Sequence, residues 1–247
     1  MKKTIMLSIA AIVASVNLSA ADTAMTKKEL ANVKSEYSKV LRNPSLKLDK
    51  GIKKANGIEV IQLSANTPYG VQKGKAFVIP DKGVIVFGEM FTKDGKKVSM
   101  PKDVKLIKES VMVTYGNGPT EIYVVSDPEC PWCQRLETNI DTSKYTIHLI
   151  PFPLAMHKNS RAVLYWILAG KDSKEVAKRF HDHMTKQDKG AWKNFKPTAE
   201  QKAKFDKIIE KGLAAGQELE VRGTPSVFDK DMNSLNNQQM SQLMQGK

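Results

Sequence analysis

The feature that most constrains this chain is a pair of cysteines, Cys130 and Cys133, separated by a Pro-Trp dipeptide. The run 122–125 before it contains only β-branched and aromatic residues, which is typical of a buried strand. Pro128 ends that strand because it lacks an N–H donor. Pro131 suits the first turn of a helix, where that donor would be unused. The sequence therefore predicts that Cys130 lies at or just before a helix N-terminus.

That position favours the reactive form of a thiol. The unpaired N–H groups and the positive dipole end of a helix N-terminus stabilise a thiolate more than a thiol. Cys130 is therefore predicted to be the attacking sulfur. Cys133 follows about one helical turn later, where it can attack a mixed disulfide on Cys130 and release the partner. The carboxylates of Asp127 and Glu129 are expected to act against this by disfavouring the thiolate.

Three other uses of a cysteine pair compete with this prediction. A zinc site needs further ligands, and the candidates, His181 and His183, would point to different faces of a helix. Haem attachment requires a histidine directly after the second cysteine, where this chain has Gln134. A structural disulfide across so short a ring would constrain little of the unfolded chain. We therefore favour thiol redox chemistry, and expect neither a metal nor a cofactor.

The residues around the cysteines resemble a known family. The run 127–133, DPECPWC, after a strand, with the run 222–227, RGTPSV, late in the chain, is similar to the bacterial periplasmic disulfide isomerases of the DsbC/DsbG family. The resemblance implies a thioredoxin-like domain in which the Thr224–Pro225 peptide is cis and faces the cysteines. It also implies a substrate-binding role for Pro131, Trp132, Thr224 and Pro225. From the residues alone, Gly-Thr-Pro is only a turn that enters a short strand.

Residues 1–21 are predicted to be a cleaved signal peptide. Two lysines precede an apolar run, 5–16, and small residues follow at 19–21. The run is too short to span a bilayer, which takes about 20 apolar residues. We therefore expect an exported chain that begins near Asp22. The resemblance places it in the periplasm, an oxidising compartment in which one cysteine pair can cycle.

Composition excludes some classes of function. The chain has 247 residues and only two cysteines, both in the motif, so its stability must come from the core and any disulfide chemistry is catalytic or local. It carries 39 Lys and Arg against 26 Asp and Glu, a net charge of +13. The lysines are spread along the chain without interleaved aromatics, so a solvated surface is favoured over nucleic-acid binding.

Residues 22–100 are predicted to form a small α+β domain, a helix plus an antiparallel sheet. Thr26 and Glu29 make a capping box, and Asn43-Pro44 should end the helix that follows. The expected buried stripe of that helix is Leu30, Val33, Tyr37, Val40 and Leu41. Strands are predicted at 58–63, 75–79, 84–87 and 90–92. Because so small a domain buries little core, and because the family pairs this domain into a homodimer around a substrate cleft, we expect a dimerisation domain.

Residues 101–118 are predicted to be a linker helix followed by a loop, and residues 119–247 a thioredoxin-like catalytic domain with inserted helices. Its second strand should span 145–152, where His148 is interpreted as a hydrogen-bonded strand histidine rather than a catalytic base. Helices are expected over 161–169, from 173 and from about 198. A short final helix should pack Met240, Leu243 and Met244. The fold class is therefore an α+β domain followed by an α/β domain.

Sequence and resemblance together favour a thiol:disulfide interchange protein that isomerises or reduces incorrect disulfides in exported proteins. The expected partners are those misfolded proteins, a second copy of the chain, and a membrane thiol-disulfide reductase as electron donor, or an oxidase partner. No nucleic acid is expected. The best-known isomerase has Gly-Tyr between its cysteines and a second disulfide, both of which this chain lacks.

Two alternative functions remain open. The dipeptide between the cysteines tunes redox poise, and its proline favours a periplasmic dithiol oxidase that donates disulfides. The other alternative is a non-catalytic chaperone or holdase, whose dimer cleft retains unfolded chains.

Overall fold

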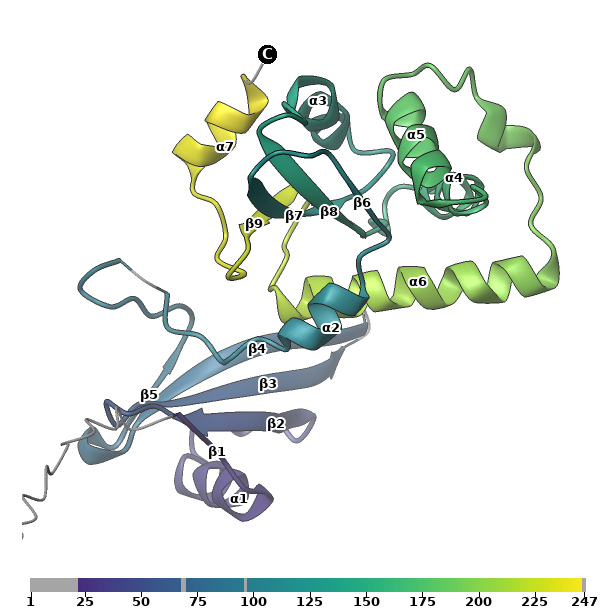
Figure 1. The fold of residues 1–247 in the computed structure, drawn as a ribbon. Helices are drawn as coiled ribbons and strands as arrows, with labels where there is room; N and C mark the ends of the chain where they lie inside the picture. The colour runs from purple at the N-terminus through teal and green to yellow at the C-terminus, as the bar shows by residue number, and fades with distance from the viewer. Residues whose placement is uncertain (1–21, 68–69, 96, 246–247) are drawn as a thin grey trace, which may run out of the picture. The chain divides into compact units, whose positions relative to one another are not determined.

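The computed structural model describes residues 22–67, 70–95 and 97–245. The predicted signal peptide, 1–21, lies outside the described residues. The chain divides into two compact units, Met1–Pro101 and Lys102–Lys247 (Figure 1). Within the described ranges, no helix is long and apolar enough to cross a membrane.

The first unit is one helix on an antiparallel sheet. The strands lie in the order β1-β2-β3-β4-β5, and they span Thr23–Ala24, Leu46–Lys53, Glu59–Thr67, Gly70–Ile79 and Val84–Phe87. The helix α1, Lys27–Glu36, begins with the predicted capping box of Thr26 and Glu29. Its Leu30 and Val33 pack on one sheet face, and the other face has its own apolar cluster, which includes Val60 and Phe77. The predicted helix-plus-sheet domain is confirmed.

Several details of this unit differ from the prediction. Helix α1 ends at Glu36, and Tyr37 is no longer helical. The helical spacing of apolar residues therefore does not determine which residues after Tyr37 face the sheet. Tyr37 and Leu41 are buried, but Val40 is 56% exposed. The strand predicted at 90–92 is absent, and Phe91 makes only an isolated bridge to Lys97. Strand β2 was not predicted, because its sequence LKLDKGIK is rich in charge and carries a bulge after Leu48.

The second unit is a four-stranded sheet between two layers of helices. The strands lie in the order β6-β8-β7-β9, and they span Val113–Tyr115, Tyr145–Pro151, Thr120–Ser126 and Ser226–Asp229. The central pair β7 and β8 is parallel, and both outer strands are antiparallel to their neighbours. The helices α2 to α7 span Val104–Glu109, Pro131–Asn139, Ser160–Leu168, Ser173–Met184, Ala199–Glu218 and Asn237–Met244.

The two faces of this sheet are covered by largely different helices, although α6 contributes to both cores, through Ile209 and Ala215. Side chains from α3, α4, α5 and α7 join one core cluster with Ile122, Val124 and Ile147. Helices α2 and α6 cover the opposite face, where Ala215 and Leu219 pack with Tyr123 and Val125 (Figure 1). The short η2, Ala191–Asn194, lies between α5 and α6. The sheet with helices inserted between β8 and β9 confirms the predicted thioredoxin-like arrangement.

The segment predicted as a linker, 101–118, is largely part of the second unit. Ile107 of α2 is fully buried in the α6 side of the core. Val113 of β6 pairs with Leu149 of β8, so this segment supplies an edge strand of the sheet. Three residues are too few for a clear alternating pattern, which is why the strand was missed.

The long helix α6 approaches the sheet closely at two glycines. A Cβ at Gly212 would lie 2.1 Å from the carbonyl oxygen of Pro151, and one at Gly216 would lie 2.2 Å from the ring of Phe152. Glycine at these positions therefore lets α6 pack directly on the end of β8, the strand beside the one that leads to the cysteines.

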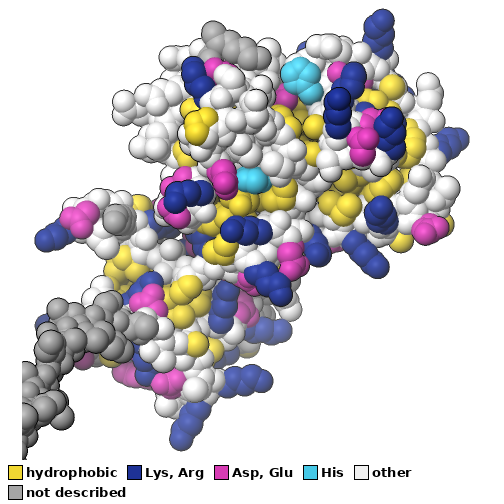
Figure 2. All heavy atoms as spheres, in the orientation of Figure 1, with side chains coloured by type: hydrophobic (Ala, Val, Ile, Leu, Met, Phe, Trp, Pro, Cys, Tyr) yellow, Lys and Arg dark blue, Asp and Glu magenta, His cyan; other side chains and the backbone are white. Residues whose placement is uncertain are grey.

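The basic side chains do not gather at one place on the face drawn in Figure 2. Lys and Arg side chains are scattered over the surface of each unit there, with Asp and Glu among them. This distribution agrees with a solvated charged surface.

Candidate active site

The two cysteines lie where the motif predicts, at the start of the helix that follows β7. Cys130 is the N-cap of α3 and Pro131 opens its first turn. The Gln134 N–H donates to the Cys130 carbonyl at 3.1 Å, the first bond of the helix. Both thiols are free and buried, with 5% of Cys130 and 1% of Cys133 exposed. As the N-cap, Cys130 lies at the end of α3 where the first N–H groups have no partner within the helix.

The environments of the two sulfurs differ. Burial, reinforced by the neighbouring Cys130, raises the pKa of Cys133 to about 12. The Cys130 thiol instead donates to the backbone carbonyl of Thr224 at 3.2 Å. Cys130 thus lies at a helix end beside a distant loop, and both cysteines are enclosed in the core, Cys133 the more completely.

The loop that contacts Cys130 is brought there by β9. This strand pairs with β7 in antiparallel register, with Ser226 opposite Val125. The residues just before β9 therefore lie beside the residues just after β7. The Thr224–Pro225 peptide is cis, as the resemblance implies, and Thr224 is the residue that accepts from Cys130.

The dipeptide between the cysteines faces outward. Pro131 is exposed, and Trp132 is 60% exposed with the Arg135 guanidinium 5.8 Å from its ring centroid. An exposed indole next to a reactive sulfur offers apolar and aromatic area to a peptide chain.

Asp127 is fully buried and receives several donors. Its Oδ1 accepts from the Glu129 N–H at 2.7 Å and from the Ser160 hydroxyl at 2.6 Å. Its Oδ2 accepts from the Leu154 N–H at 2.6 Å and lies 3.0 Å from His157 Nδ1. This carboxylate therefore ties the loop before Cys130 to the segment 154–160.

Glu129 makes a second connection to the same segment. It accepts from the Asn159 N–H at 2.6 Å and from the Asn159 side-chain amide at 2.8 Å. Although burial opposes ionisation, these bonds and those from Ser160 lower the pKa of Glu129. Helix α4 has no side-chain cap of its own at Asn159, so the loop carboxylates supply acceptors at its N-terminus.

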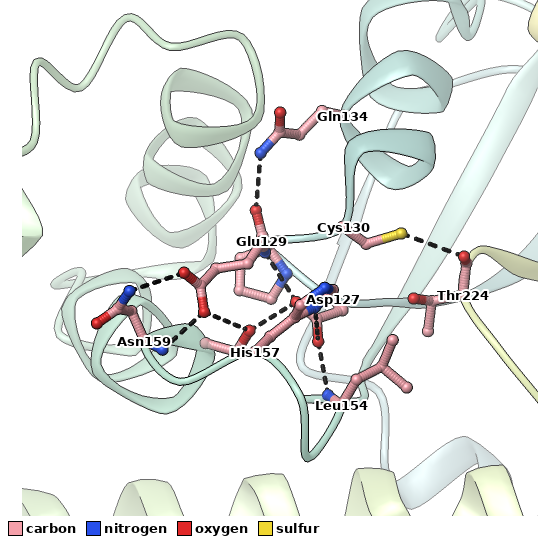
Figure 3. Close-up of polar contacts among 10 residues, drawn as sticks. Asp127, Glu129, Cys130, Gln134, Leu154, His157, Asn159 and Thr224 are labelled. Atoms are coloured by element: carbon pink, nitrogen blue, oxygen red, sulfur yellow. Dashed lines mark hydrogen bonds and ion pairs between the residues drawn. The ribbon is translucent and has the colours of Figure 1, made fainter.

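Figure 3 shows how the charges are arranged. Glu129 points toward Asn159, and the Cys130 sulfur points the opposite way, toward Thr224. The sequence indicated only that Asp127 and Glu129 are negative charges close to a thiolate. It did not indicate their partners, because His157, Asn159 and Ser160 come from a segment about thirty residues later.

The histidines considered at the sequence level have other partners. His181 Nδ1 lies 2.9 Å from Glu137, and His183 Nδ1 lies 2.8 Å from Asp188. Across the part of the chain that the structure describes, no group of three or more His, Cys, Asp and Glu side chains could hold a metal ion. His148 is hydrogen-bonded to Thr114 at 2.9 Å and stacked on Tyr123, as expected of a strand histidine.

Comparisons with known proteins match this part of the chain. A family model described as a thioredoxin-like domain matches residues 107–235. A protein named as a probable thiol:disulfide interchange protein DsbC, from Bordetella parapertussis, is 28% identical over 137 residues. Its counterpart in Bordetella bronchiseptica gives the same identity and length. The match covers 55% of this chain and 44% of each relative.

Solved structures show weaker similarity. A disulfide interchange protein from Neisseria gonorrhoeae aligns with a TM-score of 0.40 and 20% identity, over 55% of this chain and 96% of that one. A protein from Pseudomonas syringae described as a disulfide isomerase aligns with a TM-score of 0.39 and 15% identity, over 55% of this chain and 99% of that one.

Proposed function

The chain belongs to the thioredoxin-like family, and from that membership we propose that it is a thiol:disulfide interchange protein, isomerising or reducing incorrect disulfides in exported proteins. One observation carries the proposal. Cys130 is held at the N-terminus of α3 against the Thr224 carbonyl, and Cys133 follows one turn later in the core. This arrangement supports Cys130 as the nucleophilic sulfur and Cys133 as the resolving sulfur.

The proposed reaction proceeds in two exchanges. The Cys130 thiolate attacks one sulfur of a substrate disulfide, that S–S bond breaks, and the other substrate sulfur leaves as a thiolate. Cys133 then loses its proton and attacks Cys130, which releases the second substrate thiolate and leaves a Cys130–Cys133 disulfide. The substrate gains the two electrons that the protein loses. In isomerisation a substrate thiolate attacks the mixed disulfide instead, and Cys130 is regenerated.

The raised pKa of Cys133 supports an isomerase or reductase. A thiol with a pKa of about 12 is almost entirely protonated at neutral pH, so resolution waits for its proton to be removed. A substrate thiolate can therefore compete with Cys133 for the mixed disulfide on Cys130.

We assign substrate contact to the residues that surround Cys130. Thr224 and Pro225 align an extended substrate segment beside the sulfur, because they form the loop that already contacts it. Pro131 and Trp132 supply exposed apolar area on the other side of the cysteine.

We further propose that the chain is a periplasmic homodimer whose first unit makes the dimer contact. The edge strand β5 exposes Val84 and Phe87, which are 43% and 48% accessible. An apolar sheet edge with unpaired backbone groups is stabilised by pairing with a second copy. The sequence of residues 1–21 supports export, and a membrane thiol-disulfide reductase would restore the dithiol.

The test of the mechanism is covalent trapping. Replacing Cys133 by serine removes the resolving sulfur, so substrates should accumulate as mixed disulfides on Cys130, visible as thiol-sensitive adducts on non-reducing gels. Replacing Cys130 by serine is the matched control and should trap nothing. Equal trapping by both variants would show that the roles are assigned wrongly.

A second assay separates the alternative functions. A prereduced isomerase should reactivate scrambled, fully oxidised ribonuclease without added thiol. An oxidase should instead restore activity to reduced ribonuclease when supplied in its disulfide form. A protein that does neither, yet suppresses aggregation of an unfolded client, would be a holdase.

A further inference from the structure

The contact of His157 with Asp127 has no role in the exchange reaction described above. His157 Nδ1 lies 3.0 Å from Asp127 Oδ2, and Figure 3 shows the two side chains in contact on the side of the loop away from the Cys130 sulfur. The imidazole is 22% exposed and the carboxylate is fully enclosed. The contact therefore joins the protein surface to a buried charge.

The charge on Asp127 bears directly on Cys130. The Cys130 N–H donates to the Asp127 backbone carbonyl at 3.1 Å, so the two residues share one tight turn. A negative charge in the same turn as a thiol disfavours the thiolate. Water screens this effect little, because Asp127 is fully buried.

Several groups contact the Asp127 carboxylate, and they differ in whether they can carry a positive charge. Two backbone N–H groups and one hydroxyl donate to Asp127, but each of these is a neutral group. His157 is the titratable side chain that contacts this carboxylate among the described residues. Glu129, the other acidic residue of the turn, accepts hydrogen bonds from Asn159 and Ser160 at the α4 N-terminus and points away from the Cys130 sulfur (Figure 3).

We propose that His157 is a positioning residue that sets the redox poise of the cysteine pair by offsetting the charge of Asp127. The imidazole weakens the field that Asp127 exerts on Cys130, so the thiolate form and hence the dithiol state are stabilised. The inference rests on the proposed function, since it concerns the same pair of sulfurs. It adds a residue that touches neither substrate nor cysteine.

The experiment is an equilibrium titration with glutathione. The protein dithiol and oxidised glutathione exchange with the protein disulfide and two reduced glutathione molecules, and alkylated samples at each ratio give the equilibrium constant. Replacing His157 by leucine should shift this constant about tenfold toward the protein disulfide, which is about 30 mV toward a more reducing potential. Replacing it by lysine, which keeps a cationic group, should restore most of the parent value.

Two variants isolate the electrostatic cause. Replacing His183 by leucine removes a similar contact, since His183 lies 2.8 Å from Asp188 in the same unit, and should leave the constant within twofold. Replacing Asp127 by asparagine removes the charge itself and should shift the constant the opposite way. In that background the further change H157L should have no effect, because there is no charge left to offset.

The outcomes are decisive in both directions. A shift below twofold for H157L, or an equal shift for the His183 control, would overturn the inference. If H157L does not fold, as judged by circular dichroism, His157→Ala replaces it. This smaller side chain leaves space for water and should shift the equilibrium constant in the same direction, toward the protein disulfide. Failure of the unmodified protein to form a reversible disulfide at all would instead overturn the proposed function.

Discussion

Cys133 shows how burial, reinforced by the neighbouring Cys130, changes a thiol. Its pKa is raised to about 12, so very little of it is the thiolate near neutral pH, and it should react slowly with an external alkylating reagent. Iodoacetamide at pH 7.5 should therefore modify the reduced, folded protein once, at Cys130. Peptide mass spectrometry locates the modified residue.

The Cys130→Ser variant is the control for this labelling. It should remain unmodified when folded and become modified at Cys133 in denaturant, where burial is lost. Equal labelling of both cysteines in the folded protein would contradict the assigned environments.

At the scale of single residues, the sequence predicted where the two cysteines lie but not which groups contact the loop before them. Cys130 and Pro131 were placed correctly because a helix start depends on neighbouring residues. His157 and Ser160 were not predicted because their contacts with Asp127 join distant segments of the chain. A buried carboxylate requires hydrogen-bond donors. An Asp directly after a buried strand therefore suggests that donors lie nearby, but it does not identify them.

Helix α1 provides a pH-dependent test at the scale of one element. The hydrogen bond from Lys53, with those from Thr26, lowers the pKa of Glu29 to about 2. A lowered pKa contributes stability above the ordinary value of 4.5 and loses it as the pH falls toward 2. The melting temperature of wild type should therefore exceed that of Glu29→Gln above pH 4.5, and the difference should vanish near pH 2.

Comparing the two proteins at each pH removes the effect of other acidic groups. Asp141, for example, also has a pKa of about 2, because of Ser143 and Lys144, but it is present in both proteins. A melting difference that stays constant from pH 6 to pH 2 would contradict the assignment to Glu29.

The contact between α6 and β8 gives a second test at this scale. Alanine in a helix is favoured over glycine by about 1 kcal/mol, yet a Cβ at Gly212 would meet the Pro151 carbonyl at 2.1 Å. We expect Gly212→Ala to lower the free energy of unfolding by about 1 to 3 kcal/mol, the usual cost of overpacking. Denaturant unfolding measures this value.

An exposed position on the same helix serves as the control. Lys207 is exposed, and Lys207→Ala should change the unfolding free energy by no more than about 0.5 kcal/mol. If Gly212→Ala were as stable as this variant, the close approach of α6 to β8 would be wrong.

Elements with clear patterns could be predicted, and short or charged ones could not. The capping box of α1 and the apolar run of β7 are local signals, and both elements lie where they were expected. Strand β6 has only three residues, and β2 has lysine at three of its eight positions. These strands form because neighbouring strands supply hydrogen-bond partners. Those partners come from other parts of the chain, so the local sequence of each strand does not reveal them.

For the whole molecule, the main prediction concerns the oligomeric state. The mature chain should give a dimeric mass by light scattering at micromolar concentration. Replacing Phe87, a 48% exposed residue of the edge strand β5, by lysine should give a monomer, because charge on a sheet edge opposes pairing. Circular dichroism should show that the variant remains folded. A monomeric wild type would remove the basis for a shared cleft and favour the oxidase.

A second prediction follows from the division of the chain at Pro101. Deleting residues 22–101 should leave a monomeric unit that still reduces a small disulfide, since both cysteines and Thr224 lie in the second unit. The same deletion should abolish isomerisation and suppression of aggregation, which we assign to the dimer. A deleted chain that still isomerises scrambled ribonuclease would show that the first unit is dispensable.

The contact between Cys130 and Thr224 spans 94 residues of chain, and this has a consequence for biosynthesis. In the export that we propose, the N-terminal side of the polypeptide emerges first, so both thiols would reach the new compartment while the loop that faces them is still being translocated. In that interval α3 has no β9 segment beside it, and Cys130 is open to oxidants and to other nascent chains. The thiols are therefore most vulnerable before folding is complete, and the late arrival of residues 224–229 is the step that closes the site.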